Sequence, residues 1–307
     1  MAPLGVIGLG AMGLPAANAL RQAGRAVVAF DVDPGARARA AAEGVRVADG
    51  LEEIVRDAPV LLLSLPVPAV VEAVVRQVAA CARQPVLVLD TSTIDPATAR
   101  RCAEVLRAAG SDYADAPVLG RPSAVGRWTH PVGGSEAAFV RARDVLGPLA
   151  RAVVHVGDVG TGHTVKLLNN LMLGTINAAT AEVLLLAEAA GLDPGVFVDT
   201  VIDSGAASVS GLFREVAPRA VAGDFDPTFS LRLMHKDNAL ALRLAESLDV
   251  PLGVGQATQT LNTMALAAGH GALDSVAVLR VLEEVTGRLA RRHAPQADGE
   301  MTGDQVL

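Results

Sequence analysis

Lysine is almost missing from this sequence. Of its 26 basic residues, 24 are arginines, and the two lysines are Lys166 and Lys236. The two residue types are not interchangeable, because a lysine amine can lose its proton when its surroundings change whereas a guanidinium stays charged. A chain that favours arginine so strongly and keeps lysine at two positions marks those positions as candidates for amine chemistry.

Aromatic residues and excess positive charge are also scarce. The 307 residues include one Trp, one Tyr and six Phe, and the formal net charge is −7 with an isoelectric point near 5.4. Nucleic-acid binding needs basic surface and aromatic side chains on which bases stack, so nucleic acid is not an expected partner. The acidic balance argues equally against an anionic membrane surface.

Cysteine and uninterrupted apolar sequence are limited as well. Cys81 and Cys102 have no further sulfur ligand nearby, so they predict small buried hydrophobic residues rather than a thiolate metal site or a disulfide scaffold. A membrane span needs roughly 20 nearly uninterrupted apolar residues. The longest apolar stretch, residues 165–192, is interrupted by Lys166, Asn169, Asn170, Asn177, Glu182 and Glu188. It predicts a long helix buried in protein, and the lack of a targeting pattern before the first strand predicts a cytoplasmic location.

The first half of the chain alternates short apolar runs with helical patterns such as 12–23 and 34–43. The predicted strands are residues 4–10, 26–32, 59–66, 85–90, 112–118 and 152–158. This alternation predicts an α/β fold, with a largely parallel, doubly wound sheet in a domain of residues 1–161. Hydrophobic residues make up 51% of the chain, enough to give such a domain and a second one large cores.

Strand patterns nearly vanish after this domain, and residues 162–293 predict an all-helical second domain. Asp193 and Pro194, as N-cap and first helical residue, open its second helix. Further helices are predicted over 229–248 and 256–273, and a last one, capped by Asp274 and Ser275, is expected to end near His293. The polar tail, residues 294–307, lacks periodicity and is predicted to be mobile.

A glycine loop between the first predicted strand and helix indicates a dinucleotide site. The loop, in G-x-G-x-x-G spacing, consists of Gly8, Leu9, Gly10, Ala11, Met12 and Gly13. Such glycines permit a tight turn, approach of the backbone to a pyrophosphate and close packing of helix on strand. Asp31, at the end of the second predicted strand, is expected to accept hydrogen bonds from ribose hydroxyls. An NADP site would favour an arginine close to this position to pair with the additional phosphate. The next arginine is Arg37, so NAD is preferred over NADP as cofactor.

The stretch GTGHTVKLLNN, residues 160–170, places a lysine at the start of the long apolar helix. Lys166, Asn169 and Asn170 can address one helix face. The positive end of the helix dipole disfavours the charged amine, which suits proton exchange near neutral pH. Helix geometry alone leaves open that Lys166 extends to solvent, and the scarcity of lysine favours a catalytic role. His163, one turn earlier, is predicted to face solvent.

Five motifs together resemble the β-hydroxyacid dehydrogenase family, typified by 3-hydroxyisobutyrate dehydrogenase and tartronate semialdehyde reductase. They are GLGAMG, DTSTIDP, DAPV, GTGHTVKLLNN and LRLMHKDNALAL, and the resemblance covers nearly the whole chain to about residue 290. It implies an N-terminal Rossmann-type doubly wound sheet, a long interdomain helix and an all-helical C-terminal domain that takes part in oligomer contacts, in a homodimer or homotetramer. It also implies hydride transfer between NAD(H) and a small β-hydroxyacid or its semialdehyde.

The resemblance further implies roles for single residues. Lys166 would take the hydroxyl proton during oxidation and return it during reduction, with Asn170 orienting the substrate and Asn169 beside it. Lys236, with Asp237, would close over the nicotinamide. The remaining cofactor contacts that it implies are Leu65, Pro66 and Thr93. An amine base needs no metal, and no H-x-x-x-H or comparable ligand spacing is present, so no metal is expected.

The sequence departs from the family at the turn that usually binds the substrate carboxylate. The family usually has Ser-Gly-Gly after DAPV, where this chain has Leu119, Gly120 and Arg121. Leu119 has no side-chain donor, whereas Arg121 can pair bidentately with a carboxylate, sulfonate or phosphate. Arg121 is therefore the candidate for binding a small acidic substrate, with Ser92 and Ser123 as reserve donors.

Two other functions remain open. An imine-reductase-like NAD(P)H enzyme would share the architecture, but an aspartate or tyrosine would be expected where this chain has Lys166. A non-catalytic dinucleotide-binding sensor is disfavoured by Lys166, Asn170 and Lys236, although the altered turn at residues 119–121 keeps it open. A decarboxylating 6-phosphogluconate enzyme would need a larger helical domain.

Overall fold

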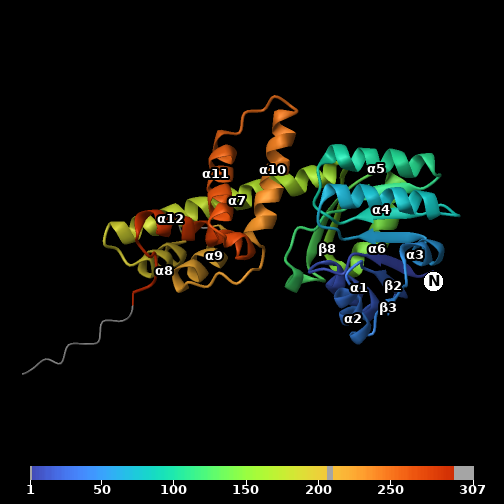
Figure 1. Ribbon diagram of the computed structural model, residues 1–307, viewed down its shortest axis with the longest axis horizontal. Helices are drawn as coiled ribbons and strands as arrows, with labels where there is room; N and C mark the ends of the chain where they lie inside the picture. The colour runs from blue at the N-terminus through green and yellow to red at the C-terminus, as the bar shows by residue number, and fades with distance from the viewer. Residues whose placement is uncertain (1, 206–209, 294–307) are drawn as a thin grey trace, which may run out of the picture. The chain divides into compact units, whose positions relative to one another are not determined.

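The computed structural model describes residues 2–205 and 210–293, and their chain path is shown in Figure 1. These residues form two compact units. The first runs to Leu171 and includes Lys236–Leu252, and the second combines Met172–His235 with the described residues from Gly253 onward. The predicted domain ranges, 1–161 and 162–293, remain predictions. The tail predicted over 294–307 lies outside the described residues.

The first unit contains an eight-stranded sheet in the order β3-β2-β1-β4-β5-β6-β7-β8. Every neighbouring pair is parallel except β6 with β7, which is antiparallel. Six strands in the order 3-2-1-4-5-6 form the doubly wound arrangement of dinucleotide-binding proteins, as the alternating pattern predicts. The strands are β1 (Leu4–Ile7), β2 (Val27–Phe30), β3 (Arg46–Val47), β4 (Val60–Leu63), β5 (Leu87–Asp90), β6 (Asp112–Asp115), β7 (Trp128–Gly133) and β8 (Ala150–Gly157).

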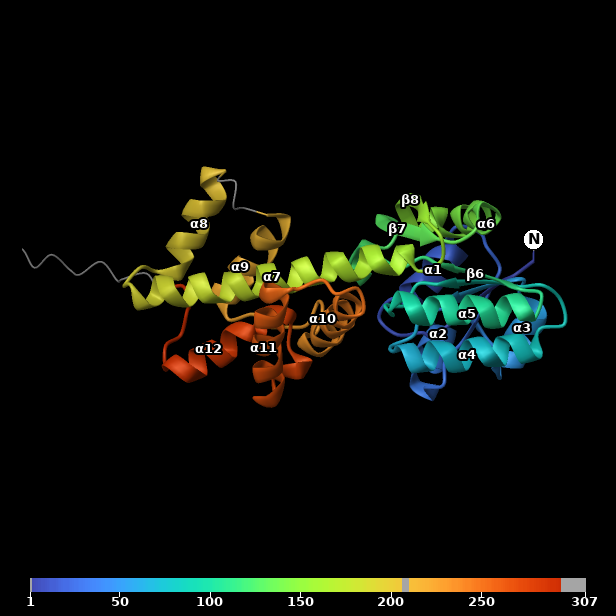
Figure 2. The same ribbon diagram turned by 90° about the horizontal axis from the view of Figure 1, so that it is seen from above.

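Both faces of this sheet are covered by helices, because successive side chains of a strand point to opposite faces. In β4, Leu62 packs into one core cluster with α1 and α6, whereas Leu61 and Leu63 pack into another with α4 and α5. Figure 2 shows α4 and α5 lying side by side on one face. The helices of this part are α1 (Gly13–Gln22), α2 (Pro34–Ala42), α3 (Leu51–Asp57), α4 (Pro68–Cys81), α5 (Pro96–Ala108) and α6 (Glu136–Leu146).

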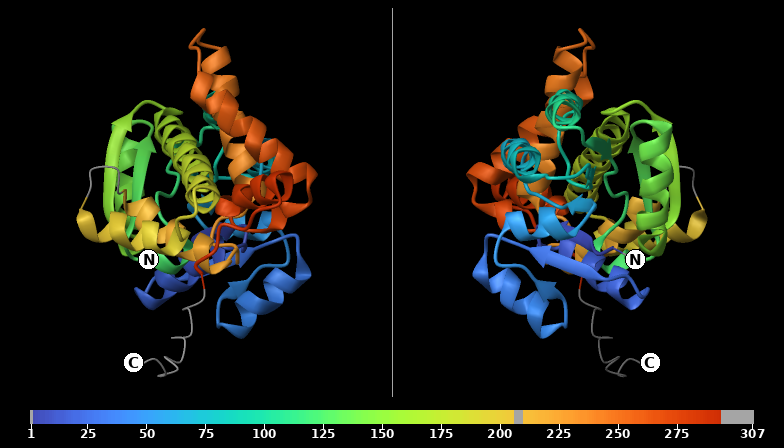
Figure 3. Two further views of the ribbon diagram at one scale, coloured as in Figure 1. Left: turned by 90° about the vertical axis from the view of Figure 1, so that its left-hand side faces the viewer. Right: turned by 90° about the vertical axis from the view of Figure 1, so that its right-hand side faces the viewer.

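The sequence did not predict β3 and β7. The first has only two residues, and the second, WTHPVG, contains a proline and a histidine that break the usual strand pattern. In β7 these residues are nevertheless buried between its two neighbours, and Figure 3 shows β7 and β8 in green as paired strands. The six predicted strands were also too long at most ends, since their patterns ran into the loops that follow.

The described part of the second unit is helical. α7 (Thr161–Ala189) begins in the first unit and continues into the second, and α10 (Leu231–Glu246) begins in the second and ends in the first. By length and composition, α7 is the one described helix that is apolar enough to cross a membrane, and half of its most apolar window is buried. The others are α8 (Pro194–Ser204), α9 (Gly211–Ala222), α11 (Gly253–Ala267) and α12 (Val278–Thr286).

The predicted N-caps Asp193 and Asp274 are confirmed, but two predicted helix ends are wrong. The helix predicted over 256–273 is α11, which begins at Gly253 and ends at Ala267. Asp193 caps α8 by accepting a hydrogen bond from the Gly195 amide at 2.6 Å. Asp274 caps a short 3-10 turn that leads into α12. The last helix ends at Thr286 rather than near His293, because Gly287 takes a left-handed conformation, with φ of 67°, that terminates it.

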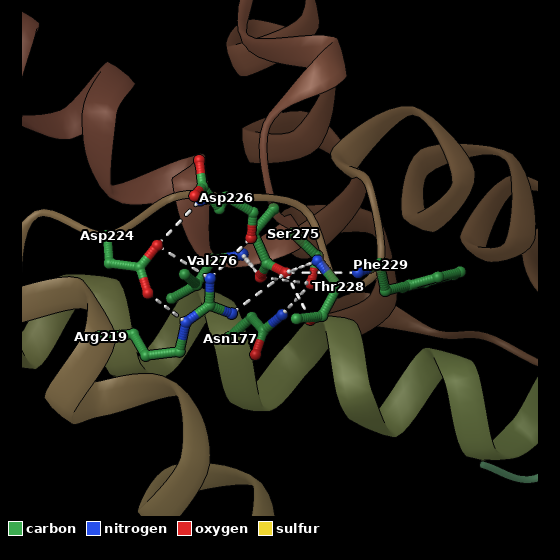
Figure 4. A network of polar contacts seen from close by, with 9 residues as sticks. Asn177, Arg219, Asp224, Asp226, Thr228, Phe229, Ser275 and Val276 are labelled. Carbon is green, nitrogen blue, oxygen red and sulfur yellow. Dashed lines mark hydrogen bonds and ion pairs between the residues drawn. The ribbon is translucent and has the colours of Figure 1, made fainter. Parts of the chain in front are cut away.

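The buried carboxylate of Asp274 organises the loops of the second unit. Figure 4 shows residues around it, among them Arg219, Thr228 and Phe229. Asp274 Oδ2 accepts hydrogen bonds from the Thr228 amide at 2.9 Å, the Thr228 hydroxyl at 2.7 Å and the Phe229 amide at 3.3 Å. The Arg219 guanidinium lies 3.6 Å from the same oxygen. One carboxylate thus joins the loop before α10 to α9 and to the start of α12.

Candidate active site

The glycine loop between β1 and α1 is shaped by packing at two positions and open at a third. A Cβ at Gly8 would lie 2.2 Å from the Ser64 carbonyl oxygen, and one at Gly13 would lie 1.9 Å from the Gly8 carbonyl oxygen. A Cβ at Gly10 would meet no heavy atom within 4 Å. Met12, at the N-cap of α1, makes no side-chain hydrogen bond to the first amides of the helix. The helix start beside Gly10 therefore has room and donors for a phosphate group.

Asp31 lies immediately beyond β2 and is tied to the glycine loop. Its Oδ2 accepts a hydrogen bond from the Leu9 amide at 2.7 Å, and its Oδ1 accepts one from the Asp33 amide at 2.8 Å. Arg37 donates through Nη1 to the Asp31 carbonyl oxygen at 2.7 Å and to the Val32 carbonyl oxygen at 3.2 Å. A carboxylate fixed beside an open glycine loop and a helix start fits a nicotinamide dinucleotide.

Lys236 of α10 lies at the carboxyl ends of β4 and β5. Its Nζ donates hydrogen bonds to the carbonyl oxygens of Thr93 at 2.9 Å and Pro66 at 3.3 Å, and lies 3.0 Å from Asp237 Oδ1. Pro66 and Thr93, which are expected to contact the cofactor, thus lie next to Lys236, which is expected to close over it. Because Lys236 follows Pro66 by 170 positions, only the folded chain brings them together.

Ser92, a predicted reserve donor, is hydrogen-bonded to the backbone beyond β4. Its side chain is buried, and its hydroxyl accepts a hydrogen bond from the Leu65 amide at 2.9 Å. Its own amide donates to Asp90 Oδ1 at 2.9 Å. Ser92 therefore fixes the backbone of Leu65 at the end of β4 through its side chain.

Lys166 lies near a hydrogen-bonded group of polar side chains that includes Asn170 and Asp237. The Lys166 Nζ donates to the Val118 carbonyl oxygen at 2.7 Å. Asn170 Nδ2 donates to Asp237 Oδ2 at 2.6 Å, and Asn169 Nδ2 donates to Asn170 Oδ1 at 3.1 Å. The pKa of Lys166 is lowered from its ordinary value, mainly because protein encloses the amine, with a further contribution from the nearby positive charge of Lys236. The negative charge of Asp237 opposes this shift but does not cancel it.

The turn at residues 119–121 is supported by β7. Leu119 and Thr129 exchange two backbone hydrogen bonds, at 2.9 and 3.1 Å, and Trp128 Nε1 donates to the Arg121 carbonyl oxygen at 2.7 Å. A Cβ at Gly120 would lie 2.5 Å from Trp128 Cδ1, so the close approach of the indole requires glycine there. The Arg121 side chain is half-buried.

The prediction that His163 faces solvent is wrong. His163 is fully buried, because the start of α7 packs onto the carboxyl ends of the strands, and its Nε2 lies 3.6 Å from Asp90 Oδ2. The Tyr113 hydroxyl donates to the same oxygen at 2.8 Å. Burial opposes a charge on His163, but Asp90 and the nearby Asp115 outweigh it and raise the His163 pKa. Burial likewise opposes the charge on Asp90, yet His163 and hydrogen bonds lower the Asp90 pKa.

Sequence reasoning missed the members of this group other than His163. Asp90 and Asp115 are the last residues of the adjacent strands β5 and β6, and Tyr113 lies two residues before Asp115 in β6. Acidic residues at the ends of apolar strand patterns were a visible signal, because such strand ends meet at one edge of a parallel sheet.

Metal ligands and reactive thiols do not form part of the described site. Within residues 2–205 and 210–293, no three His, Cys, Asp or Glu side chains are placed to hold a metal ion. Cys102 is a buried free thiol, as predicted, and burial raises its pKa to about 12. Cys81 is also a free thiol but is only partly buried.

Comparison with known proteins agrees with this geometry over both parts of the chain. The family model described as the NAD binding domain of 6-phosphogluconate dehydrogenase matches residues 3–157. The model described as NAD-binding of NADP-dependent 3-hydroxyisobutyrate dehydrogenase matches residues 160–282. Together the two models extend from β1 to α12.

Individual relatives match at similar levels. The 2-(hydroxymethyl)glutarate dehydrogenase of Eubacterium barkeri is 33% identical over 92% of this chain and 96% of its own. The 3-sulfolactaldehyde reductase of Escherichia coli is 34% identical over 95% of this chain and 99% of its own. The structure of Mycobacterium tuberculosis 3-hydroxyisobutyrate dehydrogenase with L-serine has a TM-score of 0.84, with 34% identity over 92% of this chain and 99% of that chain. The chain therefore belongs to the β-hydroxyacid dehydrogenase family of oxidoreductases, which use a nicotinamide dinucleotide.

Proposed function

We propose that the protein transfers a hydride between NAD(H) and a small β-hydroxyacid or its semialdehyde, with Lys166 as the acid/base. The observation that supports this most directly is the enclosed amine of Lys166, held on the Val118 carbonyl oxygen at 2.7 Å and lowered in pKa by its surroundings. Asn170, Asp237 and Lys236 are linked to one another, and the charges of Asp237 and Lys236 act on the Lys166 amine. Two amines and a fixed amide form the kind of metal-free site that this reaction needs.

The chemistry of Lys166 follows from its pKa. Bound NAD supplies the hydride acceptor, and a hydroxyl that loses hydride must also lose its proton to become a carbonyl. A lowered pKa leaves more of the Lys166 amine neutral near physiological pH, so it can take that proton. In reduction the ammonium form returns the proton to the carbonyl oxygen. Asn170, held by Asp237 at 2.6 Å, orients the substrate hydroxyl toward the amine.

The cofactor is expected to lie along the carboxyl ends of the strands. The open side of Gly10 and the start of α1 face its pyrophosphate, and Asp31 accepts from the adenosine ribose. Leu65, Pro66, Thr93 and Lys236 line the route toward the nicotinamide. NAD is preferred over NADP, because a 2′-phosphate would meet the Asp31 carboxylate, and Arg37 already donates to the carbonyl oxygens of Asp31 and Val32.

Arg121 is proposed to bind the acidic end of the substrate. The turn that holds it is fixed by Trp128 and by pairing with β7, so its backbone is defined. Two relatives are named for a sulfonate-bearing aldehyde and for a dicarboxylic acid, which fits an anion-binding group. Arg121→Lys keeps the charge but loses the bidentate fork, and we expect KM for the acid to rise about 10-fold or more. An unchanged KM for every accepted acid would contradict this role.

A single assay tests the central proposal. NADH absorbance is followed with a panel of 3-hydroxyacids that end in carboxylate, sulfonate or phosphate, using both NAD and NADP. The Lys166→Ala variant is expected to retain NADH binding and to lose at least about 100-fold in kcat. Turnover by the wild type with no member of the panel, together with tight NADH binding, would favour a dinucleotide sensor instead. We also propose a cytoplasmic location and a homo-oligomeric state.

A further inference from the structure

The carboxylate of Asp115, fully buried at the end of β6, binds the start of α7. Oδ1 accepts a hydrogen bond from the Gly160 amide at 2.7 Å, and Oδ2 accepts one from the His163 amide at 2.8 Å. Amides at a helix start have no partner within the helix. Asp115 therefore supplies these acceptors and fixes the first turn of α7 against the sheet.

Glycines make the space that this carboxylate occupies. A Cβ at Gly133 would lie 2.6 Å from Asp115 Oδ1, and a Cβ at Gly162 would lie 2.8 Å from Asp115 Oδ2. Gly160 has a φ of 98°, a left-handed conformation that favours glycine. Gly133, Gly160 and Gly162 form what we call the glycine socket. Two of its members belong to the stretch GTGHTVKLLNN, so the glycines of that stretch serve a contact inside the protein.

The segment that begins with Asp115 also holds the amine of Lys166. Three residues further along it, the Val118 carbonyl oxygen accepts the Lys166 hydrogen bond at 2.7 Å. Between them, the Ala116 carbonyl oxygen lies 2.8 Å from Nδ1 of His130. Burial lowers the pKa of His130 to about 4, so its imidazole is neutral at physiological pH and Nδ1 donates the proton to this carbonyl. Residues 115–118 are thus braced by β7 and contact α7 at two points.

We propose that Asp115, seated in the glycine socket, is a positioning residue that holds the first turn of α7 in the place from which Lys166 reaches its substrate. The proposal rests on the proposed acid/base role of Lys166. Asp115 fixes the helix backbone at His163. The Val118 carbonyl oxygen fixes the amine of Lys166, three residues further along α7. A displacement of a catalytic group by about 1 Å costs up to about 100-fold in rate, so loosening this turn lowers kcat.

The Asp115→Asn variant tests this role. Asparagine has the same size but only one acceptor oxygen, so it can satisfy one of the two amides at a time. We expect kcat for the hydroxyacid to fall about 10- to 100-fold. The Kd of NADH, measured by fluorescence titration, is expected to stay within about two-fold because the cofactor contacts lie on other elements. A purely structural role would instead lower Tm and leave kcat of the folded protein unchanged.

Asp193→Asn is a matched control. Asp193 also accepts from two backbone amides, capping α8 through Gly195 at 2.6 Å and binding His293 at 3.0 Å, but it lies in the second unit. It is expected to lower Tm without changing kcat. Wild-type kcat in Asp115→Asn, with Lys166→Ala inactive, would overturn the positioning role alone. Full activity of Lys166→Ala would overturn the proposed function itself.

A second variant covers the case in which Asp115→Asn does not yield folded protein. Gly162→Ala inserts a methyl group 2.8 Å from Asp115 Oδ2 and 2.5 Å from the Pro131 carbonyl oxygen. The carboxylate must then shift while its charge and both acceptors remain. A loss of kcat with NADH Kd preserved supports the positioning role, and wild-type kcat in folded Gly162→Ala overturns it.

Discussion

Lys166 differs from a surface lysine in the form that its amine takes near neutral pH. Enclosure by protein and the charge of Lys236 lower its pKa, and Asp237 only partly opposes them. The neutral amine is the base in oxidation, so we predict that kcat for hydroxyacid oxidation rises with pH through a midpoint below the usual lysine value of about 10.4. Stopped-flow or steady-state rates measured from about pH 6 to about pH 10 would locate that midpoint.

Lys166→Arg is the informative control for this profile. The guanidinium stays protonated throughout the accessible range, so it cannot act as the base. We expect the variant to keep its NADH affinity, to lose activity by at least about 100-fold and to lack the rising limb. A rising limb that survives in Lys166→Arg would assign the titration to another group.

The buried pair of His163 and Asp90 predicts a pH dependence of stability. The His163 pKa is raised in the folded state despite the opposing effect of burial, because Asp90 and Asp115 favour its charge. Its contribution is therefore fully present below the unfolded histidine value of about 6.5 and is lost as pH rises through the folded value. The free energy of unfolding should be measured in urea for wild type and His163→Gln. The difference in favour of wild type should decrease from about pH 6 to about pH 9. A difference independent of pH would contradict a charged His163.

At the scale of elements, local patterns were sufficient where a helix start or strand depends on neighbouring residues. The N-cap of α8 at Asp193 and the start of α7 at Thr161 are such cases. Contacts between distant segments could not be predicted in the same way. The Asp115 contact with Gly160 spans 45 positions, and the orientation of His163 follows from it. The sequence therefore placed Lys166 on a helix start but could not show what holds that start in position.

The carboxylate network of the second unit gives a prediction at the same scale (Figure 4). Asp274 Oδ2 accepts from the Thr228 amide, the Thr228 hydroxyl and the Phe229 amide, and it is buried. Asp274→Asn directs an amide group toward these donors and should lower the free energy of unfolding by about 2–3 kcal/mol. Thermal or urea unfolding measures this loss. Asp226→Asn, at an exposed position of the neighbouring loop, should change it by less than about 0.5 kcal/mol, and equal losses would contradict the role of Asp274.

At the scale of the whole molecule, both lysines of the chain and the residues around them lie in one compact unit. That unit is discontinuous in sequence, because Lys236–Leu252 belongs with the residues up to Leu171. The domain ranges predicted from the strand and helix patterns could not contain this feature, since those patterns change character only once along the chain. A site made of the sheet, the start of α7 and part of α10 requires the intervening helices to return the chain to the first unit.

The second-unit part of α7 gives the last prediction, which concerns assembly. Met172, Val183 and Leu186 are 66%, 41% and 68% exposed. At 3.6 residues per turn, they lie within about 60° of one another around the helix axis. An exposed apolar stripe on a helix indicates a partner, and we propose that a second copy of this chain covers it. Light scattering should give at least twice the chain mass of 31.4 kDa for wild type and the mass of one chain for Leu186→Glu.

The control is Val254→Glu, at a position of α11 that is 67% exposed, and it is expected to keep the wild-type mass. A wild type of 31.4 kDa, or a Leu186→Glu variant with the wild-type mass, would contradict this interface.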